Sequence, residues 1–241
     1  MSKNDGGGNK MKLEVMNLVH KFWNKKYEDL YNEKFIYDDG YEKYSEHSED
    51  RIVELIFRKY KPLNRWCVDV GCDSETSSNT YLMVKNDWNS IQIESNPILF
   101  TEWRTRMLDY PKVKMCSDFI TPGKIGPLVE INCLDSVLSR YGVPKYFDFL
   151  SIDVDNYEYE IWKNLRNYKP NVVCIECNQY ELDFSIIDYD PSFSLNKYRG
   201  KDKSYGGATV GLMNKLAQSK GYDYLCFDVS NAFYLRKGFV K

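Results

Sequence analysis

FDFLSIDVDNYEYEIW, residues 147 to 162, joins a short apolar run to a group of carboxylates and then to a segment with helical spacing. The run from Phe147 to Asp153 predicts a buried strand, and the segment from Tyr157 onward predicts a helix beside it. Mutual repulsion and desolvation both disfavour acids that crowd against a core. The acids at the end of this strand are therefore the first candidates for function.

From Trp66 onward the same unit recurs, because short runs rich in Val, Ile, Phe and Cys alternate with longer amphipathic runs. This alternation predicts an α/β fold with a Rossmann-like, doubly wound, mainly parallel sheet. A C-terminal antiparallel hairpin is expected to close the sheet across Val229 and Ser230. The expected strands are 66–70, 90–94, 113–116, 147–153, 172–176, 222–228 and 231–236. The expected helices are 79–87, 96–108, 134–141, 157–167 and 207–220, the last ending at Gly221.

The pattern divides the chain into three parts. Residues 1–11, rich in Gly, Asn and Lys, are expected to form a disordered tail, and residues 12–62 an N-terminal helical segment. Residues 63–241 form the main domain. Within it, the stretch 177–207 carries many Tyr, Asp and Ser but little periodicity, which is typical of a functional loop such as a lid or a substrate wall.

Composition narrows the function classes. The net charge of −2 gives no overall field for capturing nucleic acid or an anionic membrane. The sequence shows neither an apolar run of membrane-spanning length nor a secretion signal at its start, so a soluble, cytoplasmic protein is expected. The seven cysteines are expected to be reduced, buried, small hydrophobes. Cys174 and Cys177 lie within one strand and face opposite ways, which disfavours a zinc site.

The first expected strand leads into VDVGCDSETSSNTY, residues 68 to 81. Gly71 would let a ligand approach the backbone, and the polar groups after it could bind a carboxylate or an amine. The stretch lacks the later glycines of a dinucleotide fingerprint and the Gly-Lys-Ser/Thr of a phosphate loop. A tight turn before a capped helix is the alternative. The candidate cofactor contacts in this stretch are Gly71, Cys72, Asp73 and Asn79.

The next two strands end in further candidates for cofactor binding. Glu94, followed by Ser95, lies at the tip of the second strand, where a carboxylate can accept both hydroxyls of a ribose. Cys116 and Ser117 end the third strand, where the adenine edge would lie. The alternative is an ordinary exposed strand end in each case.

The fourth and fifth strands end in acids. Asp153 and Asp155 are beside the expected cofactor groove, and Glu176 and Asn178 end the neighbouring strand. These groups could hold a hard cation, or position a substrate and remove a proton, and capping of helices is the alternative. Glu158 and Glu160 are expected to be a solvated first turn of the following helix.

Five stretches, in this order, resemble the FkbM-like S-adenosylmethionine-dependent methyltransferases. They are YSEHSEDRIVELIF (44–57), CVDVGCDSETSSNTYLMVKNDWNSIQIESNP (67–97), FDFLSIDVDNYEYEIWKNL (147–165), NVVCIECNQ (171–179) and YGGATVGLMNKLAQSKGYDYLCFDVSNAFYLR (205–236). The resemblance implies a class I methyltransferase fold, with S-adenosylmethionine contacted near Gly71 and at Glu94. The chain departs from the family where the turn continues as Cys-Asp-Ser-Glu without a second glycine.

The chain also looks like the sugar O-methyltransferases that carry Asp-x-Asp at the fourth strand. That likeness implies magnesium bound by Asp153, Glu176 and Asn178, with Asp155 as general base and Asp153 assisting catalysis. The expected activity is methyl transfer to a hydroxyl of a sugar or glycan. An RNA methyltransferase and a non-catalytic binding module are the alternatives, with nucleic acid disfavoured as a partner and a homo-oligomer left open.

Overall fold

The computed structural model describes residues 23–36, 43–74, 77–121, 132–154, 157–177 and 208–240. The expected tail, the residues 12–22 that show helical spacing, most of the 177–207 stretch, Asp155 and Asn178 lie outside these described residues.

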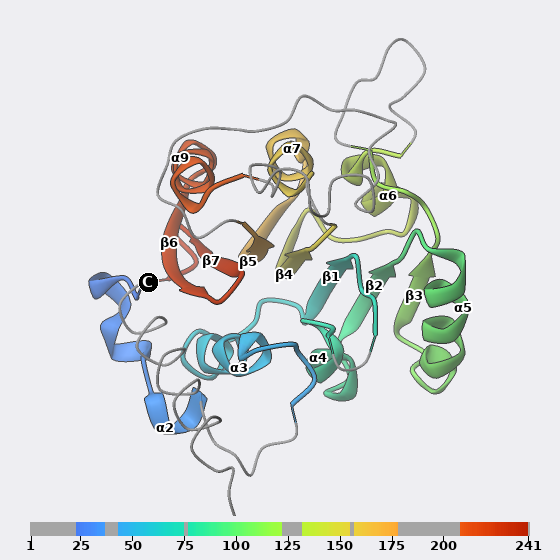
Figure 1. The fold of residues 1–241 in the computed structure, drawn as a ribbon, viewed down its shortest axis with the longest axis horizontal. Coiled ribbons are helices and arrows are strands. Elements are labelled where there is room, and N and C mark those ends of the chain that lie inside the picture. Colours follow the sequence, from blue (N-terminus) through green and yellow to red (C-terminus); the bar gives the residue numbers. More distant parts are fainter. Residues whose placement is uncertain are drawn as a thin grey trace, which may run out of the picture.

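A seven-stranded sheet runs through the protein in the order β3-β2-β1-β4-β5-β7-β6 (Figure 1). Strands β1 to β5 are parallel, and β7 pairs antiparallel with both β5 and β6. The strands are β1 (Trp66–Val70), β2 (Asn89–Ile93), β3 (Val113–Cys116), β4 (Tyr146–Ile152), β5 (Lys169–Glu176), β6 (Tyr222–Asp228) and β7 (Asn231–Arg236). The predicted doubly wound, mainly parallel sheet with a closing antiparallel hairpin is therefore confirmed.

Helices cover both faces of this sheet. Figure 1 shows α6, α7 and α9 along one face and α3 and α4 along the other, with α5 beside β3. The helical segments are η1 (Lys25–Leu30), α2 (Glu33–Ile36), α3 (Glu49–Lys59), α4 (Tyr81–Lys85), α5 (Pro97–Arg106), η2 (Met107–Asp109), α6 (Leu134–Arg140), α7 (Glu158–Asn164) and α9 (Val210–Lys220). Helix α9 ends, as predicted, at Gly221, whose φ of +84° suits glycine.

Alternation along the strands sorts the core into two layers. Val68 and Val70 of β1 pack in the layer under α6, α7 and α9, whereas Cys67 packs in the layer that holds Ile52 and Ile56 of α3. Burial of these side chains removes apolar surface from water, which is the main source of stability. Helix α3 thus packs in the core layer on one face of the sheet.

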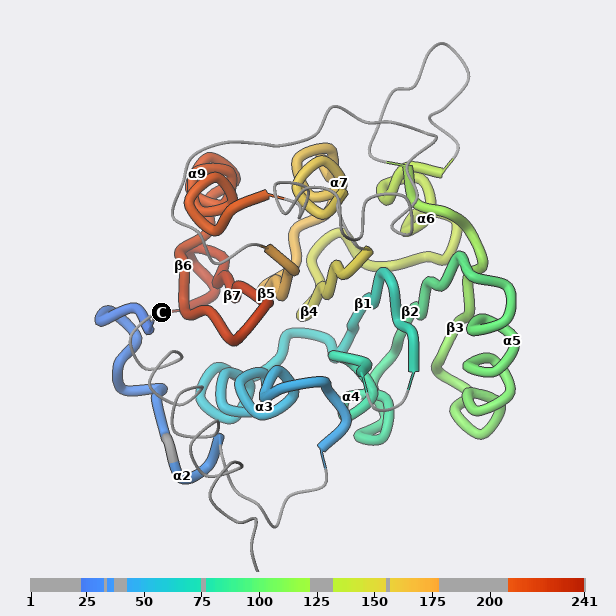
Figure 2. The backbone as a smooth tube through the Cα atoms, viewed as in Figure 1, coloured from blue at the N-terminus to red at the C-terminus, as the bar shows by residue number. Residues whose placement is uncertain are grey.

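From β1 the chain adds β2 and β3 on one side of the sheet, and from β4 it adds β5 on the other side, so the strand order switches between β1 and β4. Figure 2 shows the crossover from β1 through α4 to β2 below the sheet and the crossover from β4 through α7 to β5 above it. Such a reversal leaves a crevice outside the carboxyl ends of the two strands, where ligands bind in open α/β sheets. The site is therefore sought around the residues that follow Val70 and Ile152.

The opposite, amino-terminal edge is held by one buried carboxylate. Asp148 accepts hydrogen bonds from the backbone N–H groups of Leu63 (2.6 Å), Asn64 (2.8 Å) and Arg65 (2.7 Å). The side-chain amide of Asn171 donates to it as well, at 2.8 Å. These bonds fix the segment that enters β1 and compensate for the desolvation of a fully buried acid.

The cysteines follow the prediction. All seven are free thiols, and six of them are buried, with Cys133 half-buried. Cys174 packs in the layer that includes α3, and Cys177 packs in the opposite layer.

In the part of the chain that the structure describes, none of the helices has both the length and the apolar character to cross a membrane.

Candidate functional site

The turn after β1 is tied to the tips of both neighbouring strands. The Gly71 N–H donates to the Ile93 carbonyl at 2.9 Å, which joins the turn to β2. On the other side, a Cβ added at Gly71 would collide with the backbone carbonyl of Asp153, and the φ of +86° also requires glycine. The space next to Gly71 is thus filled by the end of β4, which brings Asp153 against the turn.

Glu94 follows β2 and is buried, with 7% of its surface exposed. Its carboxylate accepts a hydrogen bond from the Asn96 N–H at 2.7 Å and another from the backbone of Asp73. Burial raises the pKa of Glu94, and these backbone hydrogen bonds oppose the rise. Glu94, the residue predicted to bind the ribose, therefore also holds the loop that begins at Gly71 in place.

The structure thus brings Gly71, Glu94 and Asp153 together at one edge of the sheet. Gly71 meets Asp153 directly, and Glu94 meets Gly71's loop through Asp73. This convergence follows from the switch in strand order between β1 and β4.

The other residues predicted to contact the cofactor differ in their exposure to solvent. Ser95, Ser117 and Asp73 are exposed, and the Asp73 carboxylate accepts a hydrogen bond from the Ser77 hydroxyl at 3.0 Å. Cys72 and Cys116 are buried, each with 1% of its surface exposed. The two cysteines therefore offer almost no surface to a ligand at this edge.

Asn79 points into the protein. Its side-chain amide donates to the Ser151 hydroxyl at 3.1 Å and to the Cys174 sulfur at 3.8 Å, and the residue is buried. These bonds hold the loop against β4 and β5.

Asp69 is a buried acid that the sequence analysis did not single out. Its carboxylate accepts hydrogen bonds from the hydroxyls of Ser78 (2.9 Å) and Thr80 (2.8 Å). Burial raises the pKa of Asp69 to about 6, and the hydroxyls oppose the rise. An acid between two valines of a core strand, followed by a run rich in hydroxyls, is the signal that could have identified it.

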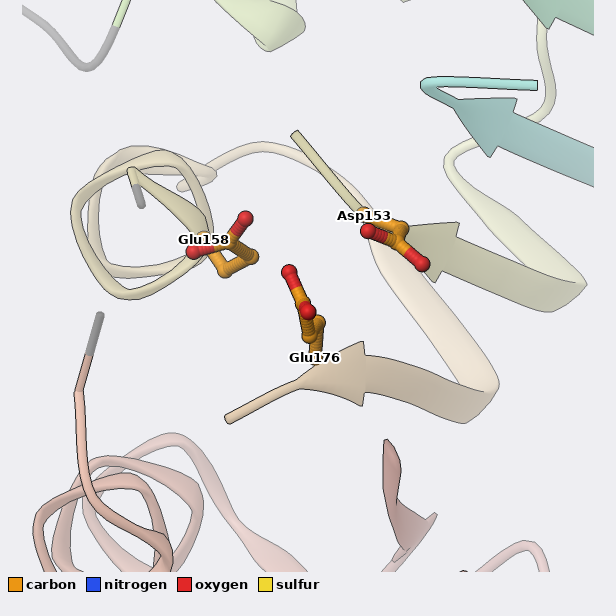
Figure 3. Close-up of side chains that lie close together, drawn as sticks. All are labelled: Asp153, Glu158 and Glu176. Carbon is orange, nitrogen blue, oxygen red and sulfur yellow. The ribbon is translucent and has the colours of Figure 1, made fainter. Parts of the chain in front are cut away.

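Three carboxylates converge at the tips of β4 and β5. Asp153 follows β4, Glu176 ends β5 and Glu158 begins α7, and Figure 3 shows their side chains gathered into one group. Each can offer one carboxylate oxygen such that all three oxygens lie within 4.8 Å of one another. Oxygen atoms at this separation could ligate one hard cation.

Glu158 is the member that the sequence analysis misjudged. It was expected to be solvated, but only 1% of its surface is exposed, and that prediction is wrong. Its carboxylate accepts a hydrogen bond from the Val154 N–H at 2.9 Å, so the first turn of α7 folds back over the end of β4. Burial raises the pKa of the Cys177 thiol, and Glu176 and Glu158 raise it further, which places both carboxylates near that sulfur.

Two further buried acids, Glu49 of α3 and Asp228 of β6, lie near the closing hairpin. Asn231 of β7 is the cross-strand partner of Glu176, and its side-chain amide donates to Glu49 at 3.0 Å. Asp228 accepts a hydrogen bond from the Ser48 N–H at 2.9 Å. Burial raises the pKa of Asp228 to about 8, and the charge of Glu49 adds to the rise. These contacts join the start of α3 to the hairpin beside the carboxylate group.

Neither a protein-family model nor a curated protein matches the chain. Solved structures with a similar fold do exist. The CMeT domain of the citrinin polyketide synthase matches at 11% identity and a TM-score of 0.47, over 78% of this chain and 51% of that one. This chain therefore spans about half the length of that structure.

Two other structures cover most of both chains. Precorrin-6y C5,15-methyltransferase from Geobacter metallireducens GS-15 matches at 11% identity and a TM-score of 0.44, over 83% of this chain and 96% of that one. The glycopeptide N-methyltransferase MtfA, complexed with S-adenosyl-L-methionine, matches at 10% identity and a TM-score of 0.43, over 84% and 91%. Similarity at this level concerns the fold alone, since one fold serves many functions.

Proposed function

We propose that this protein is an S-adenosylmethionine-dependent O-methyltransferase that acts on a hydroxyl of a sugar or of a sugar-containing small molecule. The observation that carries the proposal is the group formed by Asp153, Glu158 and Glu176, which lies beside the Gly71 turn at the switch in strand order. The choice of a sugar hydroxyl comes from the resemblance of the fourth-strand sequence to sugar O-methyltransferases.

The cofactor is proposed to lie across the ends of β1, β2 and β3. The Gly71 turn and Glu94 are the proposed contacts for its amino acid and ribose parts. Two large apolar side chains are exposed after the same strands, Ile98 at 69% and Phe119 at 50%. Exposed apolar side chains of this kind could contact the flat face of a purine.

The cluster of three carboxylates formed by Asp153, Glu158 and Glu176 could bind a divalent cation. Oxygen ligands are the ones that Mg²⁺ and Ca²⁺ prefer, and the three carboxylate oxygens are close enough to share one ion. Asp153, Glu158 and Glu176 would hold it, and Asn178, outside the described residues, remains a sequence-based candidate for a fourth ligand. A bound divalent cation would make an acceptor hydroxyl more acidic.

The residues of the chain have two tasks in this reaction. The strand tips align the acceptor oxygen with the methyl group, because the sulfonium donor is already activated. A carboxylate takes the hydroxyl proton as the C–O bond forms and the C–S bond breaks. Asp155 is proposed for this role from the resemblance, and Asp153, two residues before it, is the nearest described carboxylate in the sequence.

The net charge of −2 disfavours RNA, the alternative kept open by the sequence, because it provides no overall field for capturing phosphate groups. A non-catalytic binding module differs from the proposal in one measurable way, since it would bind the cofactor without turnover.

Calorimetry with S-adenosylhomocysteine and a turnover screen test the proposal together. Labelled S-adenosylmethionine would be offered with free sugars, glycans, nucleotide-activated sugars and RNA, with Mg²⁺ and with EDTA. Methylation of a sugar that EDTA suppresses is the expected result. Cofactor binding without methylation of any acceptor would favour the binding module, and methylated RNA would favour the nucleic-acid enzyme.

The cation has a second readout that does not depend on activity. Mg²⁺ is expected to raise the melting temperature of the wild-type protein, because it binds only the folded chain. Glu176→Gln should lose most of this shift. An equal shift in both proteins would place the ion elsewhere.

A further inference from the structure

The loop from Gly71 to Thr80 has no second glycine to shape it. Its first residues are fixed by backbone hydrogen bonds, in which the N–H groups of Gly71 (2.9 Å) and Cys72 (3.3 Å) both donate to the Ile93 carbonyl. The polar residues at its far end must be fixed by other means, since a loop free to move would have to be ordered by its ligand at a cost in affinity.

Asp69 supplies the anchor for that far end. The hydroxyls of Ser78 and Thr80 donate to the same carboxylate oxygen, Oδ2, at 2.9 Å and 2.8 Å. All three residues are buried, with at most 2% of their surface exposed. Hydrogen bonds to a buried charge are among the stronger ones in proteins. The two bonds to Asp69 therefore hold the end of the loop against β1, the strand from which the loop started.

These two hydrogen bonds belong to a larger buried hydrogen-bond network. The Thr80 hydroxyl oxygen also accepts from the Gln92 side-chain amide at 2.8 Å, and the Gln92 carbonyl accepts from the Trp103 indole at 3.1 Å. The buried loop end is thereby tied to β2 and α5 as well as to β1. A buried network whose members are satisfied holds one arrangement of its parts.

We propose that Asp69 is a positioning residue, whose carboxylate acts through Ser78 and Thr80 to hold residues 77–80 in the place that cofactor binding beside the Gly71 turn requires. The inference rests on the proposed cofactor site at that loop. It assigns to Asp69 the shaping role that later glycines would have in a glycine-rich turn. Asp69 itself lies behind the loop, away from any ligand, because both hydroxyls cover it.

This arrangement makes cofactor affinity depend on pH. Burial raises the pKa of Asp69 to about 6, and the charge of Glu94 adds to the rise. The other titratable groups that face Asp69 are the thiols of Cys67, Cys72 and Cys174. If only the ionised form holds the loop, affinity falls by about tenfold from pH 8 to pH 5 as the carboxylate takes up a proton.

The test is calorimetry of S-adenosylhomocysteine binding at several pH values. Asp69→Asn is expected to bind about tenfold more weakly than the wild type at pH 8, since charge-assisted bonds are lost, and its affinity should fall much less than that of the wild type between pH 8 and pH 5. Thr80→Val, which removes one donor and keeps the charge, should weaken binding at pH 8 and retain the dependence on pH.

Asp148→Asn is the matched control, because Asp148 is an equally buried carboxylate of the same sheet at the opposite edge. It should lower the melting temperature and leave the affinity and its pH dependence as in the wild type. Wild-type affinity in both Asp69→Asn and Thr80→Val would overturn the inference alone. A wild-type protein that binds no S-adenosylhomocysteine at any pH would overturn the proposed function and the inference with it.

Discussion

The backbone carbonyl of Asp153 occupies the space that the Cβ of any other residue at Gly71 would need. Two neighbouring strand tips are therefore in contact at the point where the proposed cofactor site meets the carboxylate group. A change at the turn must move the end of β4, and with it a proposed ligand of the cation.

Gly71→Ala tests this contact, with Gly142→Ala as its control. Both glycines have a positive φ, +86° and +71°, but a Cβ at Gly142 would meet no atom within 4 Å. Gly142→Ala is expected to lower the free energy of unfolding by about 1–2 kcal/mol through backbone strain. Gly71→Ala should lower it by about 1–3 kcal/mol more, because the collision adds to the strain. Urea denaturation of both variants measures the difference, and equal losses would contradict the contact.

Glu158→Gln tests whether the buried Glu158 is a ligand of the proposed cation. The substitution removes one charge from the group with Asp153 and Glu176, so the Mg²⁺ concentration needed for half-maximal turnover is expected to rise by about tenfold or more. Glu160→Gln, two residues along the same helix, is the control and should leave this concentration unchanged. Identical behaviour of the two variants would remove Glu158 from the site.

Asp155→Asn tests the general base inferred from the resemblance. Turnover is expected to fall by a factor of about 10²–10⁴, the usual contribution of a positioned base, while the affinity for S-adenosylhomocysteine stays near that of the wild type. Single-turnover kinetics and calorimetry provide the two numbers. Full activity would exclude Asp155 and leave Asp153 as the carboxylate to test next.

The raised pKa of Asp228 makes the free energy of unfolding depend on pH. Burial raises its pKa from 3.8 to about 8, so the folded protein holds a proton that the unfolded chain releases near pH 4. The contribution of this group to the free energy of unfolding is therefore complete below pH 4 and is lost as the pH rises toward 8.

Asp228→Asn removes this titration. Its melting temperature relative to the wild type is expected to be higher at pH 8 than at pH 5, by about 2–4 °C for each kcal/mol of linked free energy. Thermal scans at the two pH values measure the change, and a constant difference between the two proteins would contradict the raised pKa.

Much of the fold was predictable because hydrophobic period and glycine position act locally. The strands at Trp66–Val70 and Val113–Cys116 and the stop of α9 at Gly221 lie where the pattern places them. The placement of Glu94 and Asp153 at the same edge was also predictable, since parallel strands end together.

The burial of Glu158 and the role of Asp69 could not be predicted, because both depend on packing between segments that are far apart in the sequence. Glu158 lies in the first turn of a helix, where solvent exposure is the ordinary state, and only the return of α7 over β4 buries it. Asp69 needed knowledge that residues 78 and 80 fold back onto β1. Alternation along a strand predicts which face a side chain takes, but not which loop covers it.

The position of β7 between β5 and β6 has a consequence for the order of folding. Because β6 precedes β7 in the chain but reaches the sheet only through it, β5 remains an open edge during synthesis until β7 has left the ribosome. An open edge of a buried strand is a template for mispairing. A released fragment that ends at Asp228 would therefore expose the edge of β5, and it should aggregate more readily than the chain that includes β7.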